Sequence, residues 1–217
     1  MLSSVDGKIN SGSTDGLDVD ADWIEIDGLK EGLQQYYDIE QTTDLFSFNT
    51  GRVLAKIGIN DKSDIPQKSP VTFIIVDNKQ HLKETGIKYL TAWLKRLIIV
   101  TTNSEYDTFD QDVDVVFYEN EIDLNDLFAR VKRDYGAENV TIQSGGAMNG
   151  ALLRAKLIDY VNLVFAPVLV GGKDTPTLID GESLTNKNEL DQLGILKLLE
   201  CKVLKESYIN VKYEVIK

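Results

Sequence analysis

Two adjacent glycines, Gly145 and Gly146, follow a short apolar stretch, residues 140–142, and directly precede an amphipathic segment. This pattern predicts a strand that runs into a helix through a glycine turn. The first amides of a helix have no acceptor within it, and the helix dipole makes that end positive. Glycine lets a ligand approach those amides closely. The pattern favours a phosphate-containing ligand, with a simple tight turn as the alternative. The Gly-x-Gly-x-x-Gly fingerprint is absent.

Residues that commonly carry acid–base or metal chemistry are scarce in this sequence. It contains one histidine, His81, and one cysteine, Cys201. A zinc site or a histidine-based triad needs more partners than these, so we expect no metal site. We expect His81 to be a loop or helix-capping residue. Cys201 lies in an apolar run, which predicts a buried strand residue.

The composition is that of a globular protein with an acidic balance. The 217 residues are 42% hydrophobic and 27% charged, and 23 Lys and Arg against 35 Asp and Glu give a net charge of −12. This charge disfavours nucleic acid and anionic membranes as partners. No apolar run reaches the roughly 20 residues that span a bilayer, and no signal-peptide pattern is visible. These features predict a cytoplasmic protein.

Alternating strands and helices must position these residues. Apolar, β-branched runs predict strands, and helically spaced apolar residues predict the helices between them. The alternation predicts one α/β domain over residues 1–217, with a mostly parallel central sheet and helices on both faces. Two late strands with no helix between them predict a C-terminal antiparallel hairpin. The predicted strands are residues 44–49, 71–76, 97–102, 113–118, 160–167, 196–203 and 209–215, and the predicted helices are residues 29–39, 51–57, 85–95, 124–135 and the segment after Gly146.

Four motifs appear in an order that resembles one known family. They are residues 3–9 (Ser-Ser-Val-Asp-Gly-Lys-Ile), 22–24 (Asp-Trp-Ile), 144–159, which begins Ser-Gly-Gly-Ala-Met-Asn-Gly, and 166–172 (Ala-Pro-Val-Leu-Val-Gly-Gly). Together they resemble the reductase domain of riboflavin biosynthesis, the C-terminal half of the bifunctional deaminase–reductase. The resemblance implies a dihydrofolate-reductase-like fold, a small-molecule substrate and NADPH as cofactor. It implies reduction of the ribosyl group of 5-amino-6-(5-phosphoribosylamino)uracil, and a homodimer. We expect the interface at the late strands, residues 196–215, because an apolar, unpaired strand edge favours pairing.

The resemblance also implies which residues bind the cofactor. The glycine turn and helix start would hold the pyrophosphate. Gly51-Arg52 is similar to the Gly-Arg pair beside NADPH in dihydrofolate reductases, and a guanidinium suits a 2′-phosphate, although Arg52 could simply be exposed at a helix start. Thr101 and Thr102 close a strand at its carboxyl end, where ligands of α/β sheets bind. The predicted cofactor-binding set is Ser3, Trp23, Gly51, Arg52, Thr101, Thr102, Ser144, Gly145, Gly146, Ala147, Met148 and Asn149.

Asp6 is the catalytic residue that we predict from this resemblance. It lies in the turn after the first strand, which faces the active site in the family. A carboxylate there could stabilise charge that develops during hydride transfer. Asp-Gly is also a common turn pair for conformational reasons alone. Trp23, at the position that lines the nicotinamide or substrate cleft in the family, could likewise pack against the edge of the core.

The sequence departs from the family pattern at three places. Few residues precede the Ser-x-Asp-Gly turn, which indicates a short first strand or a start upstream of Met1. Residues 55–60 lack the family's acidic pair and the arginine that follows it, and Ser144 replaces a common glutamate. Two alternatives therefore stand beside a riboflavin reductase. One is a reductase of the same fold for a dihydropterin or dihydrofolate, and the other is a nucleotide-binding protein that has lost its chemistry.

Overall fold

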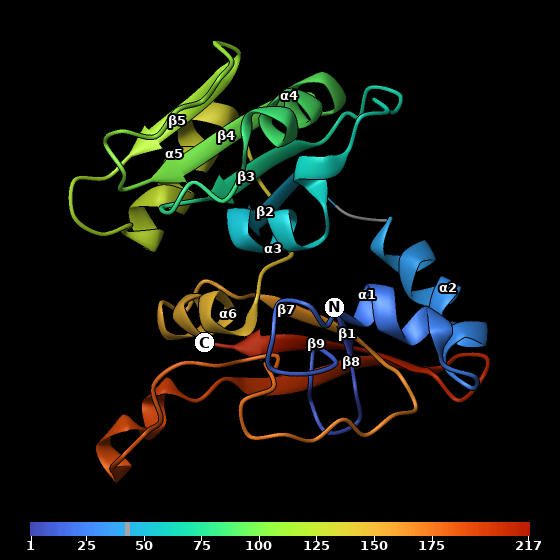
Figure 1. Ribbon diagram of the computed structural model, residues 1–217. Coiled ribbons are helices and arrows are strands. Elements are labelled where there is room, and N and C mark those ends of the chain that lie inside the picture. The colour runs from blue at the N-terminus through green and yellow to red at the C-terminus, as the bar shows by residue number, and fades with distance from the viewer. Residues whose placement is uncertain (42–43) are drawn as a thin grey trace. The chain divides into compact units, whose positions relative to one another are not determined.

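The computed structural model describes residues 1–41 and 44–217, which form two compact units (Figure 1). The first unit joins both ends of the chain, residues 1–41 and 145–217, and the second comprises residues 44–144. Each unit contains its own β-sheet. Within the described residues, no helix is long and apolar enough to cross a membrane.

The second unit is built on a parallel sheet. Its strands follow the order β5-β4-β3-β2-β6, and all neighbouring pairs run parallel. The carboxyl ends of these strands therefore lie at one edge of the sheet, the side where α/β sheets bind ligands. The strands are β2 (Phe46–Thr50), β3 (Thr72–Val76), β4 (Arg96–Thr101), β5 (Val113–Phe117) and β6 (Thr141–Ile142), and the helices are α3 (Gly51–Lys56), the 3-10 helix η2 (Ile59–Asp61), α4 (Glu84–Trp93) and α5 (Leu124–Tyr135).

Helices cover both faces of this sheet because side chains alternate along each strand. Ile75 and Ile99 share a buried cluster with Ile87 of α4. On the opposite face, the ring of Phe48 lies 5.4 Å from the ring of Phe128 in α5. Figure 1 shows α4 and α5 on the two sides of the sheet. Each buried isoleucine contributes roughly 1.5–3 kcal/mol to folding. The packed helices therefore stabilise the sheet whose strand ends form the carboxyl edge.

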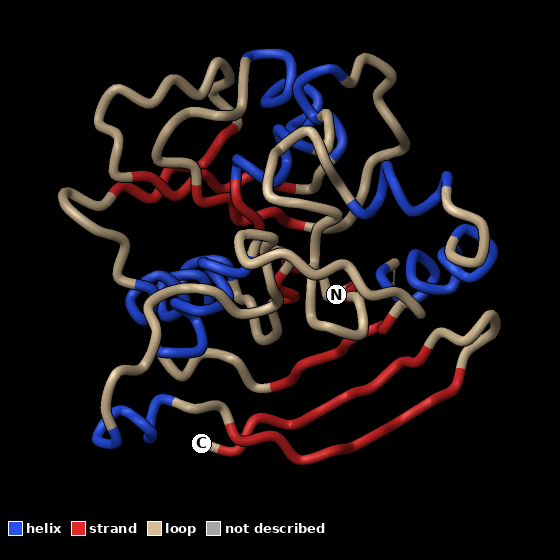
Figure 2. The backbone as a smooth tube through the Cα atoms, turned by 60° about the horizontal axis from the view of Figure 1, so that its bottom comes forward, coloured by secondary structure: helices blue, strands red, loops and turns tan. Residues whose placement is uncertain are grey.

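The first unit contains a mixed sheet in the order β1-β7-β9-β8. Strand β1 runs parallel to β7, whereas β7, β9 and β8 pair antiparallel, and β8 and β9 form the long hairpin seen in Figure 2. The strands are β1 (Leu2–Ser3), β7 (Tyr160–Phe165), β8 (Ile195–Val203) and β9 (Ile209–Ile216), and the helices are α1 (Val19–Asp22), α2 (Lys30–Glu40), α6 (Gly146–Arg154) and the 3-10 helices η1 (Trp23–Glu25) and η3 (Lys187–Gln192).

The core of the first unit forms where α2 packs on the sheet. Trp23, Leu33, Val164 and Tyr208 are almost completely buried in one cluster. The Tyr208 hydroxyl donates to the Leu29 carbonyl oxygen at 2.8 Å, so its polar end is satisfied inside the core. Because Trp23 is buried in this cluster, its aromatic ring contributes mainly by packing.

The structure confirms the predicted fold class and corrects two details. The fold is α/β with a mostly parallel sheet and a C-terminal antiparallel hairpin, as predicted. The strands form two sheets rather than one, and β1, which is two residues long, pairs with β7 in the four-stranded sheet. The predicted burial of Cys201 is wrong, since β8 lies at the sheet edge with all of its residues exposed.

Candidate functional site

Helix α6 begins as the glycine pattern predicted. Gly145 is its N-cap, and the first helical hydrogen bond runs from the Asn149 amide to the Gly145 carbonyl oxygen at 3.0 Å. The amides of Gly146, Ala147 and Met148 precede that bond and have no acceptor within the helix. Together with the positive end of the helix dipole, these donors suit an anionic group such as phosphate.

The glycines of this motif differ in what surrounds them. A Cβ atom on Gly145 would meet no atom within 4 Å. One on Gly146 or Gly150 would lie closer than 3.0 Å to the segment formed by Thr177 and Asp180. Gly146 and Gly150 are therefore required for close packing inside the first unit. Gly145 is the glycine whose open side leaves room for a ligand.

Asn149 and Asp180 fasten that packed segment to α6. The Asp180 amide donates to the Gly146 carbonyl oxygen at 2.9 Å, and the Asn149 side-chain amide donates to the Leu178 carbonyl oxygen at 2.9 Å. The Asp180 carboxylate accepts the Thr177 hydroxyl at 2.6 Å. Asn149 was predicted to bind cofactor, and here its amide group positions the segment beside the helix start.

Asp6 lies in the predicted turn, where three donors occupy its carboxylate. The Ser4 hydroxyl donates to it at 2.6 Å, and the amides of Val170 and Gly171 donate at 3.1 and 2.6 Å. These hydrogen bonds, that of Ser4 first, lower the pKa of Asp6 to about 2. The carboxylate is thus ionised at neutral pH, and it joins the turn to the loop after β7.

Sequence reasoning missed Lys8, which is the cation nearest in sequence to Asp6. The residue is 9% exposed, and its ammonium donates to the carbonyl oxygens of Gly172 and Thr175 at 2.7 and 2.9 Å. Burial of an ammonium group is costly unless its hydrogens are bonded. The signal was present in the Asp-Gly-Lys sequence, but burial of the lysine depends on a loop more than 160 residues away.

Ser3 and Trp23 are less accessible than their predicted role requires. Ser3 is 1% exposed, and its hydroxyl donates to the Ser4 carbonyl oxygen at 3.0 Å. Trp23 is 2% exposed and belongs to the core cluster described above. This burial favours the packing alternative for Trp23, and its contact with a cofactor stays a prediction.

In the second unit, Gly51, Thr101 and Thr102 lie at the carboxyl edge of the parallel sheet, and the two threonines are at the end of β4 as predicted. Gly51 starts α3 directly after β2. The Thr101 hydroxyl donates to the Asp77 carbonyl oxygen at 3.1 Å, and the Thr102 amide donates to the Asn78 side-chain oxygen at 2.9 Å. Thr101 and Thr102 therefore join the end of β4 to the end of the neighbouring strand β3.

Arg52 and Ser144 complete the predicted set. Arg52 follows Gly51 in α3 and is exposed, whereas Ser144 is 3% exposed. The guanidinium group is the type of side chain that binds phosphate oxygens, while a buried serine has little surface to offer a ligand.

A buried carboxylate that sequence reasoning did not single out lies beneath Gly51. It belongs to Asp77, the first residue after β3, and its side chain is 0% exposed. A Cβ atom on Gly51 would lie closer than 3.0 Å to this carboxylate. His81, predicted as a loop or capping residue, lies in the loop before α4 and places Nδ1 2.8 Å from the Asp77 Oδ1 atom.

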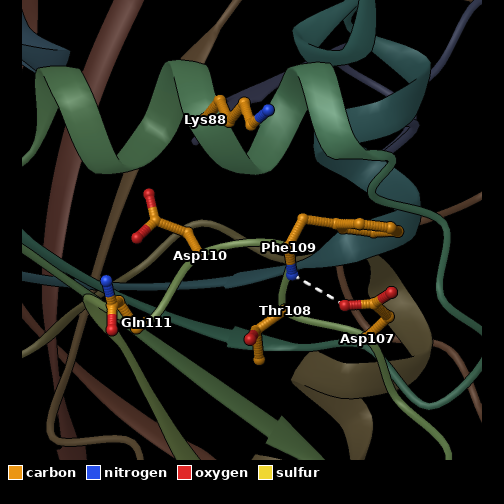
Figure 3. Close-up of a pocket in the computed structure, with 6 residues that line it drawn as sticks. All are labelled: Lys88, Asp107, Thr108, Phe109, Asp110 and Gln111. Carbon is orange, nitrogen blue, oxygen red and sulfur yellow. Dashed lines mark hydrogen bonds between the residues drawn. The ribbon is translucent and has the colours of Figure 1, made fainter.

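The surface hollow shown in Figure 3 lies apart from these residues. It is lined by Lys88 of α4 and by the segment 107–111, in which the Asp107 carboxylate accepts the Phe109 amide at 2.9 Å. It contains none of the predicted site residues. In the part of the chain that the structure describes, no group of three or more His, Cys, Asp or Glu residues could hold a metal ion.

The chain is an α/β protein, and the start of α6 presents amide donors that suit an anion. Residues 1–208 match the family model of the RibD C-terminal domain, and the chain belongs to this family. The resemblance seen in the sequence is thereby confirmed.

Curated relatives and solved structures agree with this assignment. A 2,5-diamino-6-ribosylamino-4(3H)-pyrimidinone 5′-phosphate reductase of Archaeoglobus fulgidus is 23% identical over 89% of this chain and 90% of its own length. The riboflavin biosynthesis protein RibD of Actinobacillus pleuropneumoniae is 26% identical over 98% of this chain, which spans 55% of that protein. The structure of Acinetobacter baumannii RibD shares the fold with a TM-score of 0.69 at 17% identity, covering 100% of this chain and 57% of that one.

Proposed function

We propose that this protein is an NADPH-dependent reductase of riboflavin biosynthesis that acts on a phosphorylated ribosylaminopyrimidine. The family match over residues 1–208 is the observation that carries the proposal. The Archaeoglobus relative, matched over nearly its full length, is named as a reductase of such a compound. The two units would together act as one reductase domain, because the matched residues include both.

The proposed reaction converts the ribosyl group of the substrate to a ribityl group. NADPH would supply the hydride that adds to the C1′ carbon of the opened sugar, and a proton would be taken up. Hydride transfer asks of the protein chiefly orientation and electrostatic support. Because hydrogen bonds keep Asp6 ionised, we assign it charge stabilisation and loop positioning rather than proton donation.

The start of α6 is where we propose that the first unit binds a cofactor phosphate. Three helix-start amides without helical acceptors and the open side of Gly145 support this assignment. The nearby Asp180 carboxylate is engaged by Thr177, which leaves the Gly145 side as the approach for an anion.

The strand-end edge of the second unit is where we propose binding of the adenosine side of NADPH. Gly51 and Arg52 at the start of α3, with Thr101 and Thr102 after β4, lie at the carboxyl ends of parallel strands. Arg52 would bind the 2′-phosphate, which its planar guanidinium can engage through two hydrogen bonds. The proposed cofactor-binding set also includes three buried residues that would stabilise the site, namely Ser3, Trp23 and Ser144.

NADPH oxidation tests the proposal when the substrate is varied. The diamino-pyrimidinone phosphate, its deaminated uracil counterpart and dihydrofolate would be offered in parallel, and mass spectrometry would check that the product has gained two hydrogen atoms. We expect turnover of a ribosylaminopyrimidine. Turnover of dihydrofolate alone would assign the protein to another reductase activity. Cofactor binding without turnover would indicate a protein that has lost its chemistry.

We also propose a homodimer that uses the exposed strand β8. Leu196, Leu198 and Val203 on this strand are 45%, 53% and 82% exposed. An edge strand with exposed apolar side chains favours pairing with another chain, and most such oligomers are two-fold symmetric. Sedimentation of the purified protein at micromolar concentration tests this directly, and a monomer would contradict it.

A further inference from the structure

Asp77 is the most completely hydrogen-bonded buried carboxylate in the second unit. Its Oδ1 atom accepts the His81 amide at 3.0 Å and lies 2.8 Å from His81 Nδ1. Its Oδ2 atom accepts the Leu82 amide and the Tyr106 hydroxyl, each at 3.0 Å. Both carboxylate oxygens therefore have two partners, although the side chain has no exposed surface.

These partners come from separate parts of the second unit. His81 and Leu82 belong to the loop between β3 and α4, and Tyr106 belongs to the segment between β4 and β5. Gly51, at the start of α3, packs directly on the same carboxylate. A single side chain thus hydrogen-bonds to the segments that follow β3 and β4 and packs against the helix that follows β2.

Because the Asp77 carboxylate is removed from water, it depends on these hydrogen bonds. A buried ionised carboxylate is strongly unfavourable unless donors satisfy it. Burial, and after it the nearby Asp77 charge, raises the pKa of Tyr106. The phenol therefore stays protonated and donates a hydrogen bond to Asp77. Loss of the carboxylate would leave buried donors without an acceptor in two loops at once.

The same backbone segment presents the exposed polar groups of the strand ends. The main chain of Asp77 donates to Val100 and accepts from Thr101, and the neighbouring Asn78 side chain accepts the Thr102 amide. Asn78 is exposed, while Asp77 beneath it is not. The position of the exposed groups therefore depends on the buried one.

We propose that Asp77 is a positioning residue for nucleotide binding, which holds the strand-end edge of the second unit in the shape that accepts the adenosine 2′-phosphate half of a dinucleotide. This inference rests on the proposed function. Asp77 would touch no cofactor atom and would act through Gly51, Asn78 and Thr102. The expected signature is weaker cofactor binding with an unchanged chemical step.

The test compares Asp77→Asn with a matched control, Asp110→Asn. The Asp110 carboxylate lies in the segment between β4 and β5. It accepts the Asp112 amide of that segment and the Thr91 hydroxyl of α4, each at 2.9 Å. It lies in the other part of that segment, toward the start of β5. The dissociation constant of NADPH would be measured by calorimetry, together with kcat at saturating NADPH.

Asp77→Asn should raise the NADPH dissociation constant at least about tenfold, the size of a lost hydrogen bond to a charged group. Its kcat at saturation should stay within about twofold, since orientation at the reacting carbon is not altered. Asp110→Asn should leave the dissociation constant unchanged. Tyr106→Phe removes one hydrogen-bond donor to Asp77 and keeps the ring, and it should raise the NADPH dissociation constant several-fold. If Asp77→Asn does not fold, this second variant provides the test.

Wild-type affinity in a folded Asp77→Asn protein, or in Tyr106→Phe if that variant must decide, would overturn the positioning role and leave the proposed function intact. A fall in kcat without a change in affinity would also overturn it. Failure of the wild-type protein to bind NADPH would overturn the proposed function and this inference together. The wild-type titration thus separates the two.

Discussion

Replacement of Gly150 by alanine tests the packing of α6 against the segment that contains Asp180. In an exposed helix this change would stabilise by about 1 kcal/mol, because alanine has the higher helix propensity. Here the new Cβ would meet the Asp180 carbonyl oxygen well inside 3.0 Å, and a backbone atom cannot swing away as a side chain does. Overpacking of this kind costs about 1–3 kcal/mol.

Relief of the clash would also strain two hydrogen bonds. The Asp180 amide to Gly146 and the Asn149 side chain to Leu178 hold the same segment, and each is worth about 0.5–1.5 kcal/mol. The balance is a net loss of about 2 kcal/mol after the helix gain is subtracted. For a chain of this size, that corresponds to a fall in Tm of roughly 4–8 °C.

Thermal unfolding followed by circular dichroism measures the effect, with Gly145→Ala as the control. The backbone of Gly145 (φ −78°, ψ 166°) suits alanine, and the added Cβ would be in open space. Loss of the glycine cap should cost less than about 1 kcal/mol, or roughly 2–4 °C. A Gly150→Ala protein that melts at or above the wild-type temperature would refute the close packing.

The other predictions concern the proposed site and interface. Gly145→Ala should weaken NADPH binding while lowering Tm by no more than roughly 2–4 °C, and unchanged affinity would remove the start of α6 from the site. Arg52→Ala should weaken NADPH roughly tenfold more than NADH, as expected for charge-assisted bonds to a phosphate; equal weakening of both would reject the 2′-phosphate assignment. The pKa of Asp6 is lowered from 3.8 to about 2, so its stabilising contribution is complete above the unfolded value and disappears as pH falls through the folded one. The decline of Tm between about pH 4 and 2 should therefore be shallower in Asp6→Asn, and identical acid limbs would show that its hydrogen bonds do not stabilise the fold. Leu198→Asp should yield a folded monomer, whereas a persistent dimer would locate the interface elsewhere.

Local patterns in the sequence were enough for the main strands and the longer helices and their order, but they did not predict α1 or the 3-10 helices. Apolar β-branched runs such as residues 72–76 and 97–100 allowed the parallel strands to be predicted, because strands buried on both faces need apolar side chains throughout. The glycine pair before α6 allowed the helix start to be predicted, because unpaired amides at that point are a property of any helix. The resemblance then supplied the family, which the comparisons confirmed.

Edge position and burial could not be predicted in the same way. Cys201 lies in an apolar run, yet β8 has a neighbour on one side within the described sheet, so the residue is exposed. Trp23 could have lined a cleft or filled a core, and it belongs to a buried cluster whose members include residues as distant in sequence as Tyr208. Neither outcome is encoded within a few residues of the side chain.

The sequence by itself determined most of the strands and helices, the glycine pair at which α6 begins, and which family the chain belongs to. Only the tertiary structure decided that Gly146 and Gly150 serve packing while Gly145 stays open, and that Asp77 hydrogen-bonds to the segments after β3 and β4 and packs against α3. The physical reason is the separation along the chain of the residues that each property depends on. Periodicity, caps and turns depend on neighbouring residues, whereas burial of a carboxylate and the fit of a glycine depend on atoms that come from distant parts of the chain.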